Sequence, residues 1–144
     1  MTRKAFALAG MVAAALAATL LAAPAFAHHS FAMFDQSKVL YIKGAVKELQ
    51  LVNPHAWLEI VFNNKGDAET WSFEGGSVPQ LLRLGWSKDS FKVGDKVEIG
   101  FRPLKDGSRG GQLMSVKQTN GQRVCSNRGC GDGTGTILNG TPNE

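Results

Sequence analysis

The chain lacks charge over its first part. After a short basic start, no charged residue occurs from Ala5 to Ala23, and the apolar stretch ends in Ala25–Ala27, a small-x-small sequence. This pattern is typical of a secretory signal peptide. The alternative is an uncleaved anchor, since about 20 apolar residues span a membrane. The high alanine content and the cleavage sequence favour a signal peptide over residues 1–27. We therefore expect a periplasmic or secreted protein whose mature chain begins at His28.

Neither sign of charge is in large excess. The chain has 16 basic and 12 acidic residues. Without Arg3 and Lys4, fourteen basic residues remain against twelve acidic ones, so the mature net charge is only +2. Such a small charge gives little reason to expect a nucleic-acid partner. We also expect no membrane association after cleavage. We therefore expect the partner to be a metal ion or a small molecule. The sequence does not indicate an oligomeric state.

Cysteine is scarce. Cys125 and Cys130 are the only two, in the sequence CSNRGC. Zinc sites built from cysteine need four ligands, and no second cysteine pair exists to supply them. In an oxidising compartment such a close pair usually forms a local disulfide. Because the closed loop is small, its stabilising effect should be modest.

Motifs of catalysis are also missing. The glycine-rich sequence GSRGG lacks the Gly-Lys-Ser/Thr ending of a phosphate-binding loop. No nucleophile motif is recognisable, and the carboxylates show no spacing diagnostic of an acid–base pair. We therefore expect a protein that binds a ligand and is not an enzyme.

Alternating apolar residues predict five strands. They fall at 39–52, 56–62, 69–74, 93–103 and 112–118. In the first, the alternation changes phase near Lys47-Glu48, which predicts a β-bulge. A sixth short segment, Arg123-Val124, follows the hairpin signal Asn120-Gly121.

A short helix is predicted between the third and fourth strands. Ser77 is expected to be its N-cap, with Gln80 completing a capping box. Val78, Leu81 and Leu82 would share one apolar face, and Gly85 would end the helix.

This element order predicts an all-β fold with one short helix, an OB-fold-like five-stranded small barrel. A small β-sandwich is the alternative. The barrel domain would comprise residues 28–124. Residues 125–144 are rich in glycine and poor in apolar residues, which favours a flexible C-terminal tail.

The chain has three histidines, His28, His29 and His55. Cleavage after Ala27 would give His28 a free α-amine, so its amine and ring could chelate one metal ion. A second imidazole would complete a three-nitrogen set that favours copper. His55, in the sequence NPHAW, is the remote candidate, with His29 and Met33 as further ligands. The competing interpretation is that terminal histidines are solvated and that His55 only stabilises its turn.

The segments AHHSFAMFD, KGAVKELQLVNPHAWLEI, WSFEGGSVPQLLRLGWSKDSFKVGDKVEI and RPLKDGSRGGQLMSV resemble a family of small exported bacterial proteins. That family is catalogued as a domain of unknown function, DUF6152. The resemblance implies export and a small β-rich fold, and it covers His28 to about Val124. It implies no activity, so no residue role follows from it.

Three functions are compatible with these features. The first is an exported protein that binds copper or another metal through His28, His55 and His29. The second is a metal-free OB-type module for a small molecule, saccharide or protein partner, with Trp57 and Trp71 as candidates for its binding face. The third, a copper oxidase or oxygenase on the same ligands, has no readable substrate groove to support it.

Overall fold

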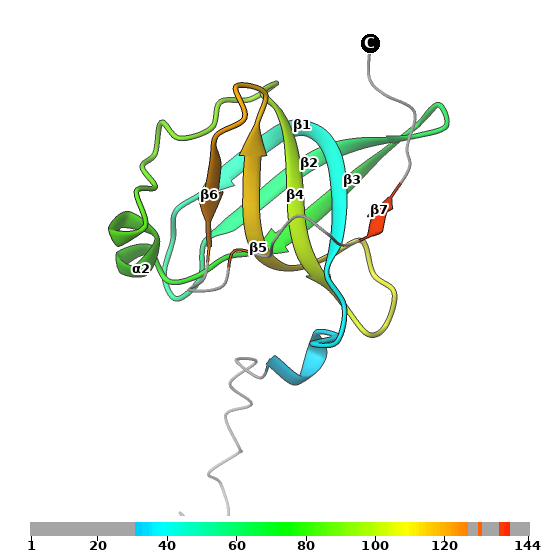
Figure 1. Ribbon diagram of the computed structural model, residues 1–144, viewed down its shortest axis with the longest axis horizontal. Coiled ribbons are helices and arrows are strands. Elements are labelled where there is room, and N and C mark those ends of the chain that lie inside the picture. Colours follow the sequence, from blue (N-terminus) through cyan, green and yellow to red (C-terminus); the bar gives the residue numbers. More distant parts are fainter. Residues whose placement is uncertain (1–30, 127–129, 131–135, 139–144) are drawn as a thin grey trace, which may run out of the picture. The chain divides into compact units, whose positions relative to one another are not determined.

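The computed structural model describes residues 31–126, 130 and 136–138, in which strands wrap around a hydrophobic core (Figure 1). The elements are the 3-10 helix η1 (Phe31–Met33), β1 (Leu40–Gln50), β2 (Trp57–Asn64), β3 (Asp67–Glu74), α2 (Val78–Arg83), β4 (Lys96–Pro103), β5 (Gly110–Gln118), β6 (Arg123–Cys125) and β7 (Thr136–Leu138).

Five of the strands close into a barrel. They pair in the order β1-β2-β3-β5-β4, and β4 pairs with β1 again. The neighbours are antiparallel except β3 and β5, which run parallel where Ser72–Glu74 lies opposite Gly110–Gln112. With α2 between β3 and β4, this is the plan of an OB-fold. The predicted OB-like barrel is therefore confirmed, and the sandwich alternative is not what the chain forms.

The predicted bulge in β1 is confirmed. Val46 lies opposite Ile60, and Glu48 lies opposite Glu59, so Lys47 is the additional residue between two consecutive partners. An extra residue bends a strand and increases its twist. This bend lets β1 pair with β4 along its first half and with β2 along its second half.

The barrel interior is filled by the alternate apolar side chains that the strand pattern predicts. Its fully buried members include Ile42, Leu58, Ile60, Phe73, Ile99, Phe101 and Val116. Trp86, which follows α2, is 2% exposed and packs edge-on against Phe91 with ring centroids 5.1 Å apart. Trp71 contacts Phe73 and Phe101.

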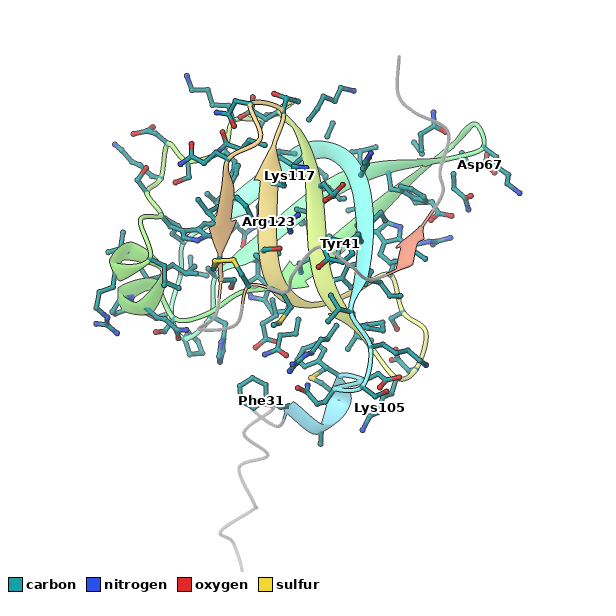
Figure 2. All side chains as sticks on the ribbon, in the orientation of Figure 1. Phe31, Tyr41, Asp67, Lys105, Lys117 and Arg123 are labelled. Carbon is teal, nitrogen blue, oxygen red and sulfur yellow. A yellow bond between two sulfur atoms is a disulfide. The ribbon has the colours of Figure 1, made fainter. Side chains whose placement is uncertain are left out.

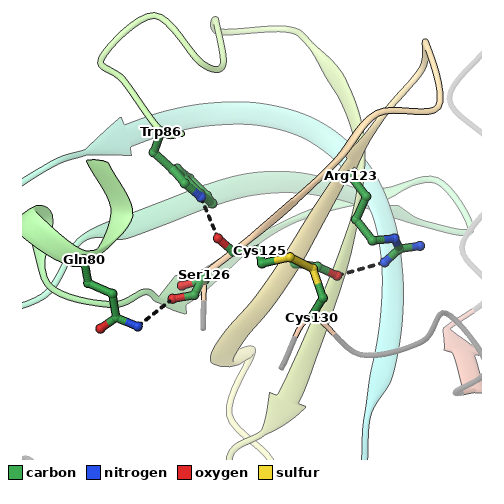
Figure 3. The surroundings of a disulfide bond; sticks show 7 residues. Gln80, Trp86, Arg123, Cys125, Ser126 and Cys130 are labelled. Carbon is green, nitrogen blue, oxygen red and sulfur yellow. Dashed lines mark hydrogen bonds between the residues drawn. A yellow bond between two sulfur atoms is a disulfide. The ribbon is translucent and has the colours of Figure 1, made fainter. Parts of the chain in front are cut away.

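The start of α2 differs from the prediction. The Ser77 side chain makes no capping hydrogen bond, and Gln80 Nε2 donates instead to the main-chain carbonyl of Ser126 at 3.4 Å (Figure 3). The predicted capping box is therefore wrong, because the Gln80 side chain donates its hydrogen bond to the distant Ser126 carbonyl. The predicted apolar face is also wrong in part: Leu81 is fully buried, but Leu82 is 54% exposed. Consecutive helical residues point about 100° apart, and α2 turns Leu81 toward the core and Leu82 toward solvent.

Two short strands lie at or inside the stretch 125–144, which was expected to be flexible: β6 ends at Cys125, and β7 comprises Thr136–Leu138. β6 pairs with β5, and β7 pairs in parallel with the start of β1. Cys125 and Cys130 form the predicted disulfide (Figure 3). Residues 127–129, 131–135 and 139–144 of that stretch lie outside the described residues.

The outer face of β1 and β5 is covered as well. Tyr41 is 1% exposed, and the Arg123 guanidinium lies over its ring, 5.6 Å from the centroid (Figure 2). Arg123 also donates to Ser115 Oγ at 2.8 Å and to Glu98 Oε1 at 3.3 Å. These contacts fix β6 against the barrel. No helix in the described ranges is long and apolar enough to cross a membrane.

Candidate metal-binding site around His55

The turn between β1 and β2 holds His55. Beside it, Ala56 continues the pairing of β2 with β3: its N–H donates to Gly76 O at 3.1 Å, and its carbonyl accepts from Gly75 N at 2.7 Å. A side chain at Gly75 would meet Ser126 Oγ at 3.3 Å and Ala56 O at 3.4 Å. The turn, the end of β3 and Ser126 are therefore packed closely around Gly75. His55 is consequently attached to a main chain that is hydrogen-bonded on both sides of Ala56.

The His55 ring lies against two oxygen atoms. Nδ1 is 3.3 Å from the main-chain carbonyl of Gly75 and 3.4 Å from Glu74 Oε1. The His55 side chain is 29% exposed, and that of Glu74 is 16% exposed. The imidazole is thus held on its Nδ1 side and partly accessible to solvent.

Glu74 belongs to a row of register partners that crosses four strands. Its register partners are Trp57 on β2 and Gln112 on β5, and Gln112 in turn lies opposite Arg102 on β4. Trp57 is 38% exposed, whereas Gln112 is 7% exposed. Within the described ranges, Arg102 Nε and Gln112 Oε1 are buried atoms with no hydrogen-bond partner. This row connects His55 with the strand that anchors the N-terminal arm.

The N-terminal arm comprises residues 31–37 and is bound to the β4–β5 end of the barrel. The Asp35 N–H donates to Pro103 O at 2.8 Å, and Lys105 N–H donates to Met33 O at 3.0 Å. Phe34 forms an isolated bridge with Leu104 and is 5% exposed. These contacts fix the arm from Phe31, two positions after His29, against the barrel (Figure 2 marks Phe31 and Lys105).

The arm is also stabilised by its own carboxylate. Asp35 Oδ1 accepts from the Ser37 hydroxyl at 2.6 Å and from Ser37 N–H at 3.1 Å, and Oδ2 is 2.9 Å from Lys38 Nζ. The hydrogen bonds of Ser37, and then that of Lys38, lower the pKa of Asp35 to about 2. Gln36 accepts a hydrogen bond from Arg102 Nη1.

The predicted ligands are only partly described. His28 and His29 lie outside the described residues, so His55 is the predicted histidine that can be placed. Met33 lies on η1 and is 42% exposed. Among residues 31–126, 130 and 136–138, no group of three or more His, Cys, Asp or Glu side chains converges as a metal site. The predicted ligand set therefore stays a prediction.

Glu74 is the neighbour that the sequence-based reasoning missed. It was considered only as one of several acidic residues without diagnostic spacing, and its contact with His55 spans 19 positions. The signal available was the position of Glu74 at the end of the third strand, since paired strands bring the start of one to the end of the next. Of the two tryptophans proposed for a binding face, Trp71 packs against the core and only Trp57 is exposed.

One family matches this sequence, described as "Family of unknown function (DUF6152)", over residues 15–114. The chain belongs to the DUF6152 family. The match spans all three histidines and Glu74, and it ends at Met114, before β6 and both cysteines. Neither the curated proteins nor the solved structures contain a significant match. Membership in DUF6152 therefore brings no activity with it, and function must be argued from the residues.

Proposed function

We propose that this member of DUF6152 is an exported, periplasmic binding protein that takes up copper or another metal ion. The ligands would be the α-amine and ring of His28 together with His55, with His29 as a further donor. The role would be metal handling or sensing, and no catalysis is proposed. Nitrogen ligands of this kind bind copper most tightly among the divalent first-row metals.

The observation that carries the proposal is the setting of His55. Its Nδ1 lies at hydrogen-bonding distance from the Gly75 carbonyl, and its side chain is neither deeply buried nor fully solvated. Histidines that ligate metals almost always donate the second ring N–H to a carbonyl or carboxylate.

Chain length sets a limit on the proposal. Three residues lead from His28 to Phe31, where η1 begins, and an extended chain spans at most about 3.3–3.6 Å per residue, which gives about 10 Å. The row from Arg102 to Glu74 crosses two strand spacings of about 4.8 Å each, also about 10 Å. Since the arm is bonded to Arg102 and Pro103, the proposal requires residues 28–30 to extend across this row toward His55.

The test compares two N-termini. Copper is titrated into the protein that begins at His28 and into a form that retains Ala27. One added residue moves the amine away from the His28 ring, so the second form should lose most of the affinity. His55→Ala should weaken binding as well, whereas Gln36→Ala, a change in the arm that removes no nitrogen ligand of the proposed set, serves as the control. Equal affinity of all four proteins would refute the proposal.

A second candidate, the metal-free binding module, is favoured by the buried row. Arg102 Nε is a donor and Gln112 Oε1 an acceptor, and neither has a partner within the described ranges. Buried polar groups are nearly always satisfied, if necessary by water or a ligand. A small hydroxyl-bearing molecule would pair with both atoms. Binding of mono- and disaccharides that is abolished by Gln112→Leu and unaffected by His55→Ala would favour this function over metal binding.

A further inference from the structure

The Glu74 carboxylate is placed to act on His55. It sits at the end of β3, directly before Gly75, and its Oε1 is 3.4 Å from His55 Nδ1. At 16% exposure the side chain has lost most of its water. A carboxylate that is largely desolvated is costly unless it is paired or hydrogen-bonded. His55 is the partner that the structure gives it.

The position of Nδ1 decides the protonation of the ring. Two oxygen atoms that lie next to Nδ1, Gly75 O and Glu74 Oε1, are hydrogen-bond acceptors. In a neutral imidazole one nitrogen carries the proton and the other the lone pair. A lone pair on Nδ1 would face two oxygen atoms and be repelled by both. The proton therefore belongs on Nδ1, and the lone pair belongs on Nε2.

We propose that Glu74 is a positioning residue that holds His55 in the Nδ1–H tautomer and makes Nε2 the metal-ligating atom. A carboxylate behind a ligating histidine fixes the orientation of the ring, and its negative charge favours a divalent cation. This inference rests on the proposed function for its metal part. The assignment of the tautomer stands apart from it, since that concerns the protein without metal.

The first experiment needs no metal. Two-bond proton–nitrogen NMR spectra of protein with labelled histidine distinguish the two neutral tautomers at pH 8. His55 of the wild type is expected as Nδ1–H. In Glu74→Leu, the share of the Nε2–H tautomer is expected to rise, whereas Glu74→Gln, which keeps an acceptor oxygen, should resemble the wild type. A wild-type His55 in the Nε2–H form would overturn the proposal whether or not copper binds.

The second experiment measures copper affinity in the same variants. Loss of a residue that supports a ligating histidine typically costs 10–100-fold in metal affinity. We expect about 100-fold for Glu74→Leu and about 10-fold for Glu74→Gln. The matched control is Glu59→Gln, because Glu59 is a half-buried strand carboxylate that pairs with Lys47 at 3.0 Å. It should bind copper as the wild type does.

The two experiments separate the possible failures. Unchanged tautomer and unchanged affinity in Glu74→Leu would overturn the positioning role. The expected tautomer change together with full copper binding by His55→Ala would sustain the positioning of His55 by Glu74 and refute its use as a metal ligand. A loss of affinity in Glu59→Gln equal to that in Glu74→Gln would show a general effect of charge and would also overturn the proposal.

Discussion

The indole Nε1 of Trp86 donates a hydrogen bond of 2.8 Å to the main-chain carbonyl of Cys125 (Figure 3). The bond joins a buried residue of the core, which follows α2, to the last residue of β6. Next to it, buried Ser126 accepts from Gly76 N and donates its own N–H to Met114 O. The family match ends at Met114. Cys125 and Ser126, which lie beyond the family match, therefore form hydrogen bonds with polar groups of residues inside it.

Replacing Trp86 with Phe should show the value of this bond. The variant keeps an aromatic ring but leaves the Cys125 carbonyl without its donor, at a cost of about 1–3 kcal/mol in the free energy of unfolding. Urea denaturation measures the change. Trp57→Phe is the control, because Trp57 is exposed and exposed substitutions usually stay within about 0.5 kcal/mol. Equal stability of the two variants would contradict the assigned role of the indole N–H.

Removal of the disulfide should have a measurable but limited effect. Cys125 and Cys130 are five positions apart, so the loop they close is small. Chain entropy predicts a stabilisation of about 2 kcal/mol for such a loop. Cys125→Ser with Cys130→Ser should lower the free energy of unfolding by that amount and leave the circular dichroism spectrum of the barrel unchanged. Complete unfolding of the double variant at 25 °C would show that the disulfide carries far more of the fold.

Gly111 should tolerate no side chain. It lies on β5 between Pro103 of β4 and Phe73 of β3, and a Cβ would approach the Arg102 carbonyl oxygen to 2.1 Å. Because that atom belongs to the main chain, the strands must separate, and we expect Gly111→Ala to cost about 3 kcal/mol. Thermal unfolding provides the measurement. Gly121→Ala, in open space at a positive φ, should cost only about 1 kcal/mol.

The arm should respond to acid through Asp35. Its pKa in the folded protein is lowered to about 2, below the ordinary value near 3.9, so folding favours the ionised carboxylate. That contribution is complete above about pH 4 and is lost as the pH falls through about 2. Asp35→Asn should therefore reduce the acid sensitivity of amide hydrogen exchange at Phe34 and Asp35. An Asp35 carboxyl that titrates near 3.9 by NMR would contradict the hydrogen-bonded geometry.

Local sequence signals located much of the barrel. The alternation of apolar residues indicated β2 and β3, and the change of phase near Lys47 indicated the bulge. Both follow from the two-residue period of a strand, which acts over neighbouring residues only. The disulfide in CSNRGC could likewise be predicted from the sequence, because the chain has only these two cysteines and they lie five positions apart.

Predictions failed where a distant partner competed with a local one. Gln80 was expected to cap α2, but the Ser126 carbonyl receives its side-chain hydrogen bond. Glu74 had no recognisable role until β2 and β3 paired and placed it beside His55. Ser126 lies 46 positions from Gln80, and Glu74 meets His55 at the open end of the β2–β3 hairpin, 19 positions away. Capping and spacing rules that act over a few residues therefore did not find either contact.

The sequence by itself determined the order of the five barrel strands and α2, the inward-facing apolar residues, the bulge at Lys47 and the candidate ligands by residue type. Only the tertiary structure decided that β3 and β5 close the barrel in parallel and that the Nδ1 atom of His55 faces the oxygens of Glu74 and Gly75. The reason is physical: side-chain periodicity is a local property of the chain, whereas hydrogen bonds between strands depend on which segments the folded chain brings together.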